Sequence, residues 1–162
     1  MVEMIELSKI FCKDKKYNIK RRNKEPYYEH CIRVGNLVSE LTKDEDVIAA
    51  AYLHDILEHT DTTEKELTDA FNDKVTDLVK ELTSDREMIK IKGKFEYLVE
   101  KFNIVTNDSL LIKLCDRYDN LTDSGSKPSY SMETLKLIKK IDRKLNKSHK
   151  KMIELINSVI IN

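Results

Sequence analysis

The chain has 162 residues, of which 40% are hydrophobic and 36% charged, and its 29 Lys and Arg balance its 29 Asp and Glu. This length suits one domain with a real hydrophobic core, here taken as residues 1–162. The neutral charge argues against a protein that coats DNA or RNA. Because no apolar run approaches the ~20 residues needed to span a bilayer, no membrane segment is expected.

The cysteines and the N-terminus indicate a cytoplasmic protein. Cys12, Cys31 and Cys115 are odd in number, are widely spaced and form no Cys-x-x-Cys pair. They are therefore interpreted as reduced thiols that act as small buried hydrophobes, with neither a disulfide frame nor a zinc knuckle. The N-terminal segment carries acids early and lacks a signal peptide's order of basic, apolar and small-residue regions.

Apolar residues recur at helical spacing almost throughout, and the chain has only three Gly and two Pro, so long helices are expected. The sequence predicts an all-α bundle of about eight to ten helices. In chain order these are one near 3–15, one striped by Cys31, Val34, Val38 and Leu41, one capped by Asp44 that carries Val47 through Leu57, one near 64–71, one that runs to about Leu82, and further ones near 88–102, 108–121, 131–145 and 147–160.

Three local signals mark the ends of these helices. A basic, irregular stretch, KKYNIKRRNKEP, follows the first helix and closes at Pro26. The pattern Thr63-x-x-Glu66 has the form of a capping box. The segment SGSKPS at 124–129 is the clearest turn or linker, because it combines a glycine with a proline.

The stretch AYLHDILEHTDTT at 51–63 places ionisable residues in an otherwise apolar helix. On a continuous helix His54 and Asp55 point about 100° apart, so both reach one point only in a groove beside the helix. Glu58 lies four residues after His54 and shares its face. Imidazoles and carboxylates together suit a first-row divalent metal.

Further ligands must come from elsewhere, and two candidates stand out. His30 begins the second helix, and Asp116 interrupts the apolar run LLIKLCDRYDNL. A buried carboxylate needs a cation or a hydrogen-bond network. The two cations closest in sequence to Asp116, Lys113 and Arg117, do not share its i+4 face, so a metal ion is the economical explanation.

The pattern His…His-Asp…Asp resembles that of the HD-domain phosphohydrolases, and more narrowly the hydrolase domain of RelA/SpoT proteins and the small stand-alone alarmone hydrolases of the metazoan type. The resemblance rests on EPYYEH, YLHDILEHTDTT, DLVKELTSD and LLIKLCDRYDNL, and covers nearly the whole chain. It implies a helical HD domain with a metal site in its central groove. It also implies an Mn²⁺-dependent enzyme that removes the 3′-pyrophosphate from the starvation alarmone (p)ppGpp, a small-molecule nucleotide. The donor set by itself also allows Fe²⁺ or Zn²⁺.

The resemblance also implies roles for individual residues. The metal ligands would be His30, His54, Asp55 and Asp116. Glu58 would position or deprotonate the attacking water, and Asn120 would support the site from the helix that carries Asp116. The candidate substrate-binding residues are the basic side chains Lys16, Arg21, Arg22, Lys113 and Arg117, and Tyr130 is a candidate for the aromatic residue that helps to hold the nucleotide.

One departure from the family pattern keeps other functions open. The family has Glu-Asp where this chain has Glu58-His59. His59 can perform acid–base chemistry near neutral pH, because an unperturbed imidazole has a pKa of ~6.5. It is equally compatible with another nucleotide substrate, such as NADPH, or with a module that binds nucleotide and cleaves it weakly or not at all. The sequence is silent on the oligomeric state.

Overall fold

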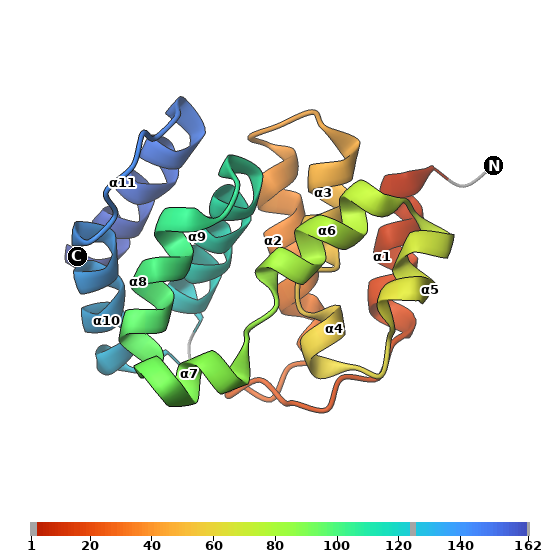
Figure 1. Ribbon diagram of the computed structural model, residues 1–162, viewed down its shortest axis with the longest axis horizontal. Coiled ribbons are helices and arrows are strands. Elements are labelled where there is room, and N and C mark those ends of the chain that lie inside the picture. Colours follow the sequence, from red (N-terminus) through yellow and green to blue (C-terminus); the bar gives the residue numbers. More distant parts are fainter. Residues whose placement is uncertain (1–2, 124–125, 162) are drawn as a thin grey trace. The chain divides into compact units, whose positions relative to one another are not determined.

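A computed structural model describes residues 3–123 and 126–161 of the chain (Figure 1). Within these ranges the regular secondary structure is all α-helical, which confirms the predicted fold class, and eleven helices are present. The contacts between Cα atoms divide the chain into two compact units, Met1–Thr83 and Ser84–Asn162. One domain over the whole chain stays a prediction. None of the described helices is both long and apolar enough to cross a membrane.

The first unit is organised around its third helix. Its helices are α1 (Met4–Asp14), α2 (Tyr27–Ser39), α3 (Glu45–Tyr52), α4 (Ile56–His59), α5 (Glu64–Ala70) and α6 (Asp73–Leu82). Helix α3 packs against α1, α2 and α6, and every residue from Val47 to Tyr52 is buried. Asp44 caps this helix as predicted, since its Oδ1 accepts a hydrogen bond from the backbone N–H of Asp46 at 3.0 Å.

A glycine allows α2 to lie close to α3. A Cβ atom added at Gly35 would overlap the Cγ, Cδ1 and Cε1 atoms of Tyr52. The Tyr52 side chain is buried, and its hydroxyl donates a hydrogen bond of 2.6 Å to Asn36 Oδ1. Because burial and this bond fix the ring, no larger side chain fits at Gly35. This packing positions α2, which carries His30, against the end of α3.

The expectation of a continuous third helix through Leu57 is wrong, because α3 ends at Tyr52. Residues 53–55 form a turn, and α4 follows as a separate short helix. Leu53 (φ −101°, ψ 6°) and Asp55 (φ −102°, ψ 3°) have backbone angles of the bridge region. This conformation is sparsely populated in general and is common among active-site residues.

The physical reason for the break is competition for one carbonyl group. In a continuous helix the carbonyl oxygen of Ala51 would accept a hydrogen bond from the N–H of Asp55. Here it accepts instead from the N–H of His54 at 3.4 Å and from the His54 ring nitrogen Nδ1 at 2.7 Å. His54 and Asp55 therefore lie on a turn, and their expected helical separation does not apply.

The predicted capping box is confirmed at the start of α5. The Thr63 hydroxyl accepts a hydrogen bond from the Glu66 N–H at 3.1 Å, and the Glu66 carboxylate accepts one from the Thr63 N–H at 3.3 Å. The box satisfies two backbone donors that the first turn would otherwise leave exposed. It also marks the end of the loop that leads from the His-Asp turn.

The second unit is organised around α9. Its helices are α7 (Arg86–Lys92), α8 (Lys94–Ile104), α9 (Asn107–Thr122), α10 (Pro128–Lys139) and α11 (Lys147–Ile161). Helix α9 packs against α10 and α11 and buries an apolar stripe made of Leu110, Leu111, Ile112, Leu114 and Cys115. This stripe is the apolar run in which the sequence places Asp116.

Two boundaries in the second unit differ from expectation. The helix expected near 88–102 is divided at Gly93, whose φ of 86° lies in the left-handed region that favours glycine. The helix expected near 131–145 begins earlier, at Pro128, and ends at Lys139. Proline suits a first helical position because its missing N–H needs no partner there. Within the predicted turn at 124–129, Ser124 and Gly125 lie outside the described residues.

Candidate metal centre and basic groove

Three of the predicted ligands come together in the first unit. His30 lies on α2, and His54 and Asp55 lie on the turn between α3 and α4. One candidate ligand atom from each lies within 4.8 Å of the others. The Nε2 atom of His54 is 3.1 Å from Asp55 Oδ2, and that of His30 is 3.8 Å from the same oxygen. Both imidazoles are buried, with 1% and 3% exposure.

Hydrogen bonding shows which nitrogen of His54 is available to bind a metal. Its Nδ1 atom lies 2.7 Å from the carbonyl oxygen of Ala51. A carbonyl can only accept, so Nδ1 carries the proton, and in the neutral ring Nε2 has a lone pair. That lone pair faces the Asp55 carboxylate, which is also an acceptor. Two acceptors at 3.1 Å repel each other unless a proton or a cation lies between them.

The chemistry of this donor set fits a divalent first-row metal. Two imidazoles and a carboxylate suit Mn²⁺, Fe²⁺ and Zn²⁺. Ligand atoms that lie ~2.1 Å from a metal at a right angle are ~3.0 Å apart, close to the 3.1 Å between His54 Nε2 and Asp55 Oδ2. The bond from His54 Nδ1 to a backbone carbonyl is a typical support for a metal-binding imidazole. His30, His54 and Asp55 thus form a candidate metal cluster.

Glu58, which is predicted to position or deprotonate the attacking water, and its neighbour His59 both lie on α4. Glu58 Oε2 is 3.2 Å from His59 Nε2, and both side chains are largely buried. The backbone carbonyl of His59 accepts a hydrogen bond from the Asn18 N–H at 2.8 Å, which ties the end of α4 to the loop between α1 and α2. The pair therefore lies on a short helix whose end is anchored to that loop.

The fourth predicted ligand belongs to the second unit. Asp116 lies on α9 and is half-buried. The Asn120 side chain, one turn further on, donates hydrogen bonds of 3.3 Å to Asp116 Oδ1 and to the Tyr130 hydroxyl oxygen. Burial raises the pKa of Tyr130, so its phenol stays protonated. Asn120 thus contacts the Asp116 carboxylate from the same helix, and its support of a metal site stays a prediction.

The basic residues beside Asp116 interact with other groups. Arg117 donates a hydrogen bond of 2.6 Å to Glu133, and its guanidinium lies 4.3 Å from the centre of the Tyr130 ring. The Lys113 ammonium lies 5.9 Å from the centre of the Phe102 ring. Arg117 is buried, whereas Lys113 is half-buried. Within the second unit, the Glu133 carboxylate and the Tyr130 ring therefore offset part of the charge of Arg117.

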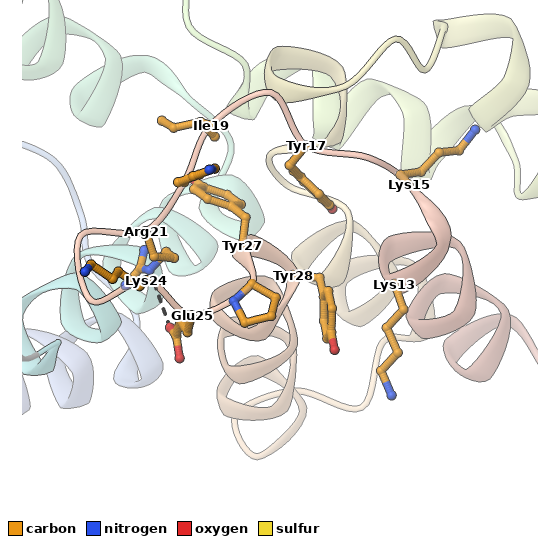
Figure 2. Close-up of a pocket in the computed structure, with 11 residues that line it drawn as sticks. Lys13, Lys15, Tyr17, Ile19, Arg21, Lys24, Glu25, Tyr27 and Tyr28 are labelled. Carbon is orange, nitrogen blue, oxygen red and sulfur yellow. Dashed lines mark ion pairs between the residues drawn. The ribbon is translucent and has the colours of Figure 1, made fainter.

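A basic groove of about 630 Å³ lies in the first unit, beneath the loop between α1 and α2 (Figure 2). Its lining residues include five cations and three tyrosines: Lys13, Lys15, Lys20, Arg21, Lys24, Tyr17, Tyr27 and Tyr28. The one carboxylate in the lining, Glu25, receives two hydrogen bonds from Arg33, at 2.6 and 3.1 Å. These bonds hold the pKa of Glu25 below its usual value. The groove consequently favours anions.

The predicted substrate residues have different environments in this region. Arg21 is buried and its Nε atom lies 3.5 Å from Glu25, whereas Arg22 and Lys16 are exposed. Lys24, which the sequence did not single out, has a φ of 68°, unusual for a residue with a side chain. Lys13 at the end of α1, and Lys15, Lys20 and Lys24 in the loop, were not singled out because lysines at such positions resemble a solvated surface.

Comparison with known proteins identifies the family. A family model described as HD domain matches residues 10–145. The chain is 37% identical over 122 residues to a guanosine-3′,5′-bis(diphosphate) 3′-pyrophosphohydrolase of Aquifex aeolicus, covering 74% of this chain and 17% of that protein. It is 36% identical over 118 residues to the enzyme of the same name, MESH1, of Danio rerio, covering 70% and 64%. The chain therefore spans only a small part of the bacterial relative and less than two thirds of the fish one.

Solved structures show the same fold. A metazoan ortholog of SpoT has a TM-score of 0.79 at 24% identity, over 98% of this chain and 96% of that one. A protein of Listeria monocytogenes EGD-e has a TM-score of 0.65 at 20% identity, over 84% and 98%. The chain belongs to the HD domain family. Within it, the chain is related to the SpoT and RelA hydrolases and to the metazoan stand-alone hydrolases.

Proposed function

We propose that this protein is a metal-dependent phosphohydrolase that removes the 3′-pyrophosphate of (p)ppGpp and releases GDP or GTP together with pyrophosphate. The observation that carries this proposal is the cluster of His30, His54 and Asp55 in a chain of the HD domain family. Its relatives named as guanosine-3′,5′-bis(diphosphate) 3′-pyrophosphohydrolases support the substrate. Residues 1–162 would form one HD domain in the cytoplasm, where thiols such as its three buried free cysteines stay reduced.

The metal would be held by His30, His54 and Asp55, with Asp116 of the second unit as the fourth ligand. The motif order and the support that Asn120 gives to Asp116 favour this role. Mn²⁺ is the proposed ion, and Fe²⁺ or Zn²⁺ would suit the same donors. When bound, such an ion lowers the pKa of water and offsets phosphate charge.

Glu58 and His59 would supply the acid–base chemistry. Glu58 lies three residues beyond Asp55, and its carboxylate can orient the attacking water and accept its proton. His59 lies 3.2 Å from Glu58. A neutral imidazole there can receive that proton, and an imidazolium can pass it to the leaving oxygen. General acid–base catalysis of this kind contributes ~10²–10⁴-fold to the rate.

The basic groove would bind the polyanionic nucleotide. The groove lysines would attract its phosphates, and the exposed Arg22 and Lys16, which belong to the same loop but not to the groove lining, can form charge-assisted hydrogen bonds to phosphate oxygens. Arg21, which is buried against Glu25, would act mainly by holding the loop in place. Lys113 and Arg117 would add positive charge from the second unit.

The direct test is to incubate the purified protein with Mn²⁺ and ppGpp and to separate the products by chromatography. The expected products are GDP and pyrophosphate, with no turnover after chelation of the metal and none by Asp55→Ala. If wild-type protein cleaves NADPH or another nucleotide in a small panel but leaves ppGpp intact, the proposed substrate is wrong. If Asp55→Ala retains full activity, the proposed site is wrong.

A second comparison defines the part played by His59. The variant His59→Asp restores the Glu-Asp pair of the family pattern. A strong increase in ppGpp hydrolysis would mean that the natural chain has moved away from this substrate. Equal or lower activity would mean that the imidazole performs the work of the missing acid. Glu58→Gln serves as the matched control, because it removes the proposed base and leaves His59 in place.

A further inference from the structure

A tyrosine hydroxyl contacts the carboxylate of the candidate metal cluster. The phenol of Tyr27 donates a hydrogen bond of 2.9 Å to Asp55 Oδ2. This is the oxygen that faces His54 Nε2 at 3.1 Å and His30 Nε2 at 3.8 Å. One carboxylate oxygen is therefore surrounded by the phenol and both imidazoles.

The helical spacing of α2 explains why the phenol and one ligand reach the same carboxylate. Tyr27 is the first residue of α2, and His30 follows three residues later, so both lie on one face of the helix. Their rings meet edge to face, with 5.8 Å between the ring centres. Tyr28 lies about 100° further round the helix and lines the basic groove.

Neighbouring rings hold Tyr27 in this position. Tyr17 stacks on it with 5.2 Å between ring centres and an interplanar angle of 27°. His59 meets it edge to face at 5.5 Å. The hydroxyl of Tyr17 lies 3.3 Å from the Cys12 sulfur, so the stack is itself attached to α1. These contacts consequently hold the Tyr27 ring in the position from which its hydroxyl donates to Asp55.

We propose that Tyr27 is a positioning residue of the metal centre, whose hydroxyl fixes the Asp55 carboxylate in the orientation that binds the ion. This inference rests on the metal site of the proposed function, but not on the identity of the nucleotide. Hydrogen bonds to metal-binding carboxylates orient the ligand before the ion arrives, and their loss typically costs 10–100-fold in metal affinity or activity. Tyr27 also lines the basic groove, but its effect on the metal acts through Asp55 and needs no substrate.

The test is the Mn²⁺ affinity of Tyr27→Phe, measured by calorimetry, with Tyr28→Phe as the matched control on the adjacent position. Tyr27→Phe removes one hydroxyl and keeps the ring that packs against Tyr17, His30 and His59. We expect its Mn²⁺ affinity to fall 10–100-fold, with an unchanged melting temperature for the metal-free protein. Tyr28→Phe should bind Mn²⁺ like wild type. A Tyr27→Phe affinity within twofold of wild type would overturn the inference.

A double-mutant cycle with Asp55→Asn tests whether Tyr27 acts through Asp55. Once the carboxylate is gone, Tyr27→Phe should cost little further Mn²⁺ affinity, whereas an equal cost in both backgrounds would contradict a route through Asp55.

Wild-type protein offers a test without variants, should Tyr27→Phe fail to fold. Because the chain has seven Tyr and no Trp, one equivalent of Zn²⁺ should perturb the tyrosine near-UV difference spectrum, and no change would count against the contact.

Measurements of Mn²⁺ affinity and of ppGpp hydrolysis test the role of Tyr27 and the proposed function independently. Metal affinity is measured without any nucleotide, so a wild-type protein that does not hydrolyse ppGpp can still show the loss in Tyr27→Phe. In the opposite case, wild-type protein hydrolyses ppGpp, but wild type and Tyr27→Phe bind Mn²⁺ with equal affinity. The proposed function then stands, and the proposed role of Tyr27 is wrong. A wild-type protein that binds no Mn²⁺ overturns both the metal site and this inference.

Discussion

At the scale of single residues, the tautomer of His54 and the backbone conformation of Lys24 bear most directly on the candidate sites. His54 directs its Nε2 lone pair toward Asp55 because its other ring nitrogen binds Ala51. Lys24 keeps a left-handed backbone conformation in a loop that lines the basic groove. Such conformations cost of order 1–3 kcal/mol and tend to cluster at functional sites.

Replacement of Lys24 separates stability from anion binding. Lys24→Gly should raise the free energy of unfolding by ~1 kcal/mol, because glycine adopts a positive φ without strain. It should also weaken the binding of pyrophosphate, because it removes a cation from the groove. Urea unfolding and calorimetry measure the two effects. The matched variant Lys24→Ala should lose the same affinity without the gain in stability, and intact pyrophosphate binding in both would exclude Lys24 from the site.

His149 gives the second unit a stability that depends on pH. The ring is buried, its Nδ1 accepts a hydrogen bond from the Asn146 N–H at 3.2 Å, and its Nε2 lies 2.8 Å from the Asn107 carbonyl. Burial lowers its pKa below the usual 6.5. The unfolded chain therefore binds more protons between the two pKa values, and stability falls as the pH drops through 6.5 toward the folded value.

The corresponding experiment compares urea unfolding at pH 7.5 and pH 5.5. We expect wild type to be less stable at pH 5.5, and His149→Gln to show a smaller loss between the same two pH values. The difference between the two losses of stability gives the contribution of His149, separate from that of the histidines of the first unit. An identical loss in both proteins would mean that other groups cause the pH dependence.

At the scale of elements, the interruption of the third helix creates the candidate metal cluster. A continuous helix would point His54 and Asp55 in different directions, whereas the turn at 53–55 brings their ligand atoms to 3.1 Å. The close packing of α2 on α3 then brings His30 to the ligand atoms of His54 and Asp55. The distance between these two helices is thus a determinant of the site.

Gly35→Ala tests this packing. The added methyl group would overlap the buried ring of Tyr52, and overpacking of this kind costs ~1–3 kcal/mol. Thermal and urea unfolding should show this loss, and Mn²⁺ affinity should fall because α2 moves away from α3. Ser39→Ala, on an exposed position of α2, is the control and should stay within ~0.5 kcal/mol of wild type. A Gly35→Ala protein of wild-type stability would show that the close approach is dispensable.

The sequence predicts elements better than it predicts breaks. Helical periodicity, the Asp44 cap and the Thr63–Glu66 box all have local causes, and the structure confirms them. The breaks at Leu53 and Gly93 differ in origin. The first depends on a side chain that competes for a backbone carbonyl, and the second on one residue with a positive φ. Periodicity alone carries neither signal.

Sequence reasoning identified the candidate metal ligands, but not all of the residues that contact them. His30, His54 and Asp55 were predicted from their ionisable chemistry within apolar runs, together with the family resemblance, and their ligand atoms lie together. Tyr27 was missed, although its three-residue spacing from His30 is visible in EPYYEH. The groove lysines were missed because only the folded loop shows that they share one concave surface.

At the scale of the whole molecule, the two compact units divide the proposed ligands unequally. The first unit carries three ligands and the Glu58–His59 pair, and the second carries Asp116 with its Asn120 support. If all four ligands bind one ion, metal binding links the units thermodynamically. A ligand that binds only the folded state stabilises it by mass action, by ~2.7 kcal/mol at a concentration of 100 Kd. Saturating Mn²⁺ should therefore raise the melting temperature of both units together.

A calorimetric titration with Mn²⁺ measures the stoichiometry and affinity of the proposed metal centre in wild type, His54→Ala, Asp116→Ala and the control Asp108→Ala. We expect one Mn²⁺ per chain in wild type and in the control, and at least tenfold weaker binding in each of the two ligand variants. Wild-type affinity in His54→Ala would contradict the existence of the metal centre, and wild-type affinity in Asp116→Ala would remove the second unit from it.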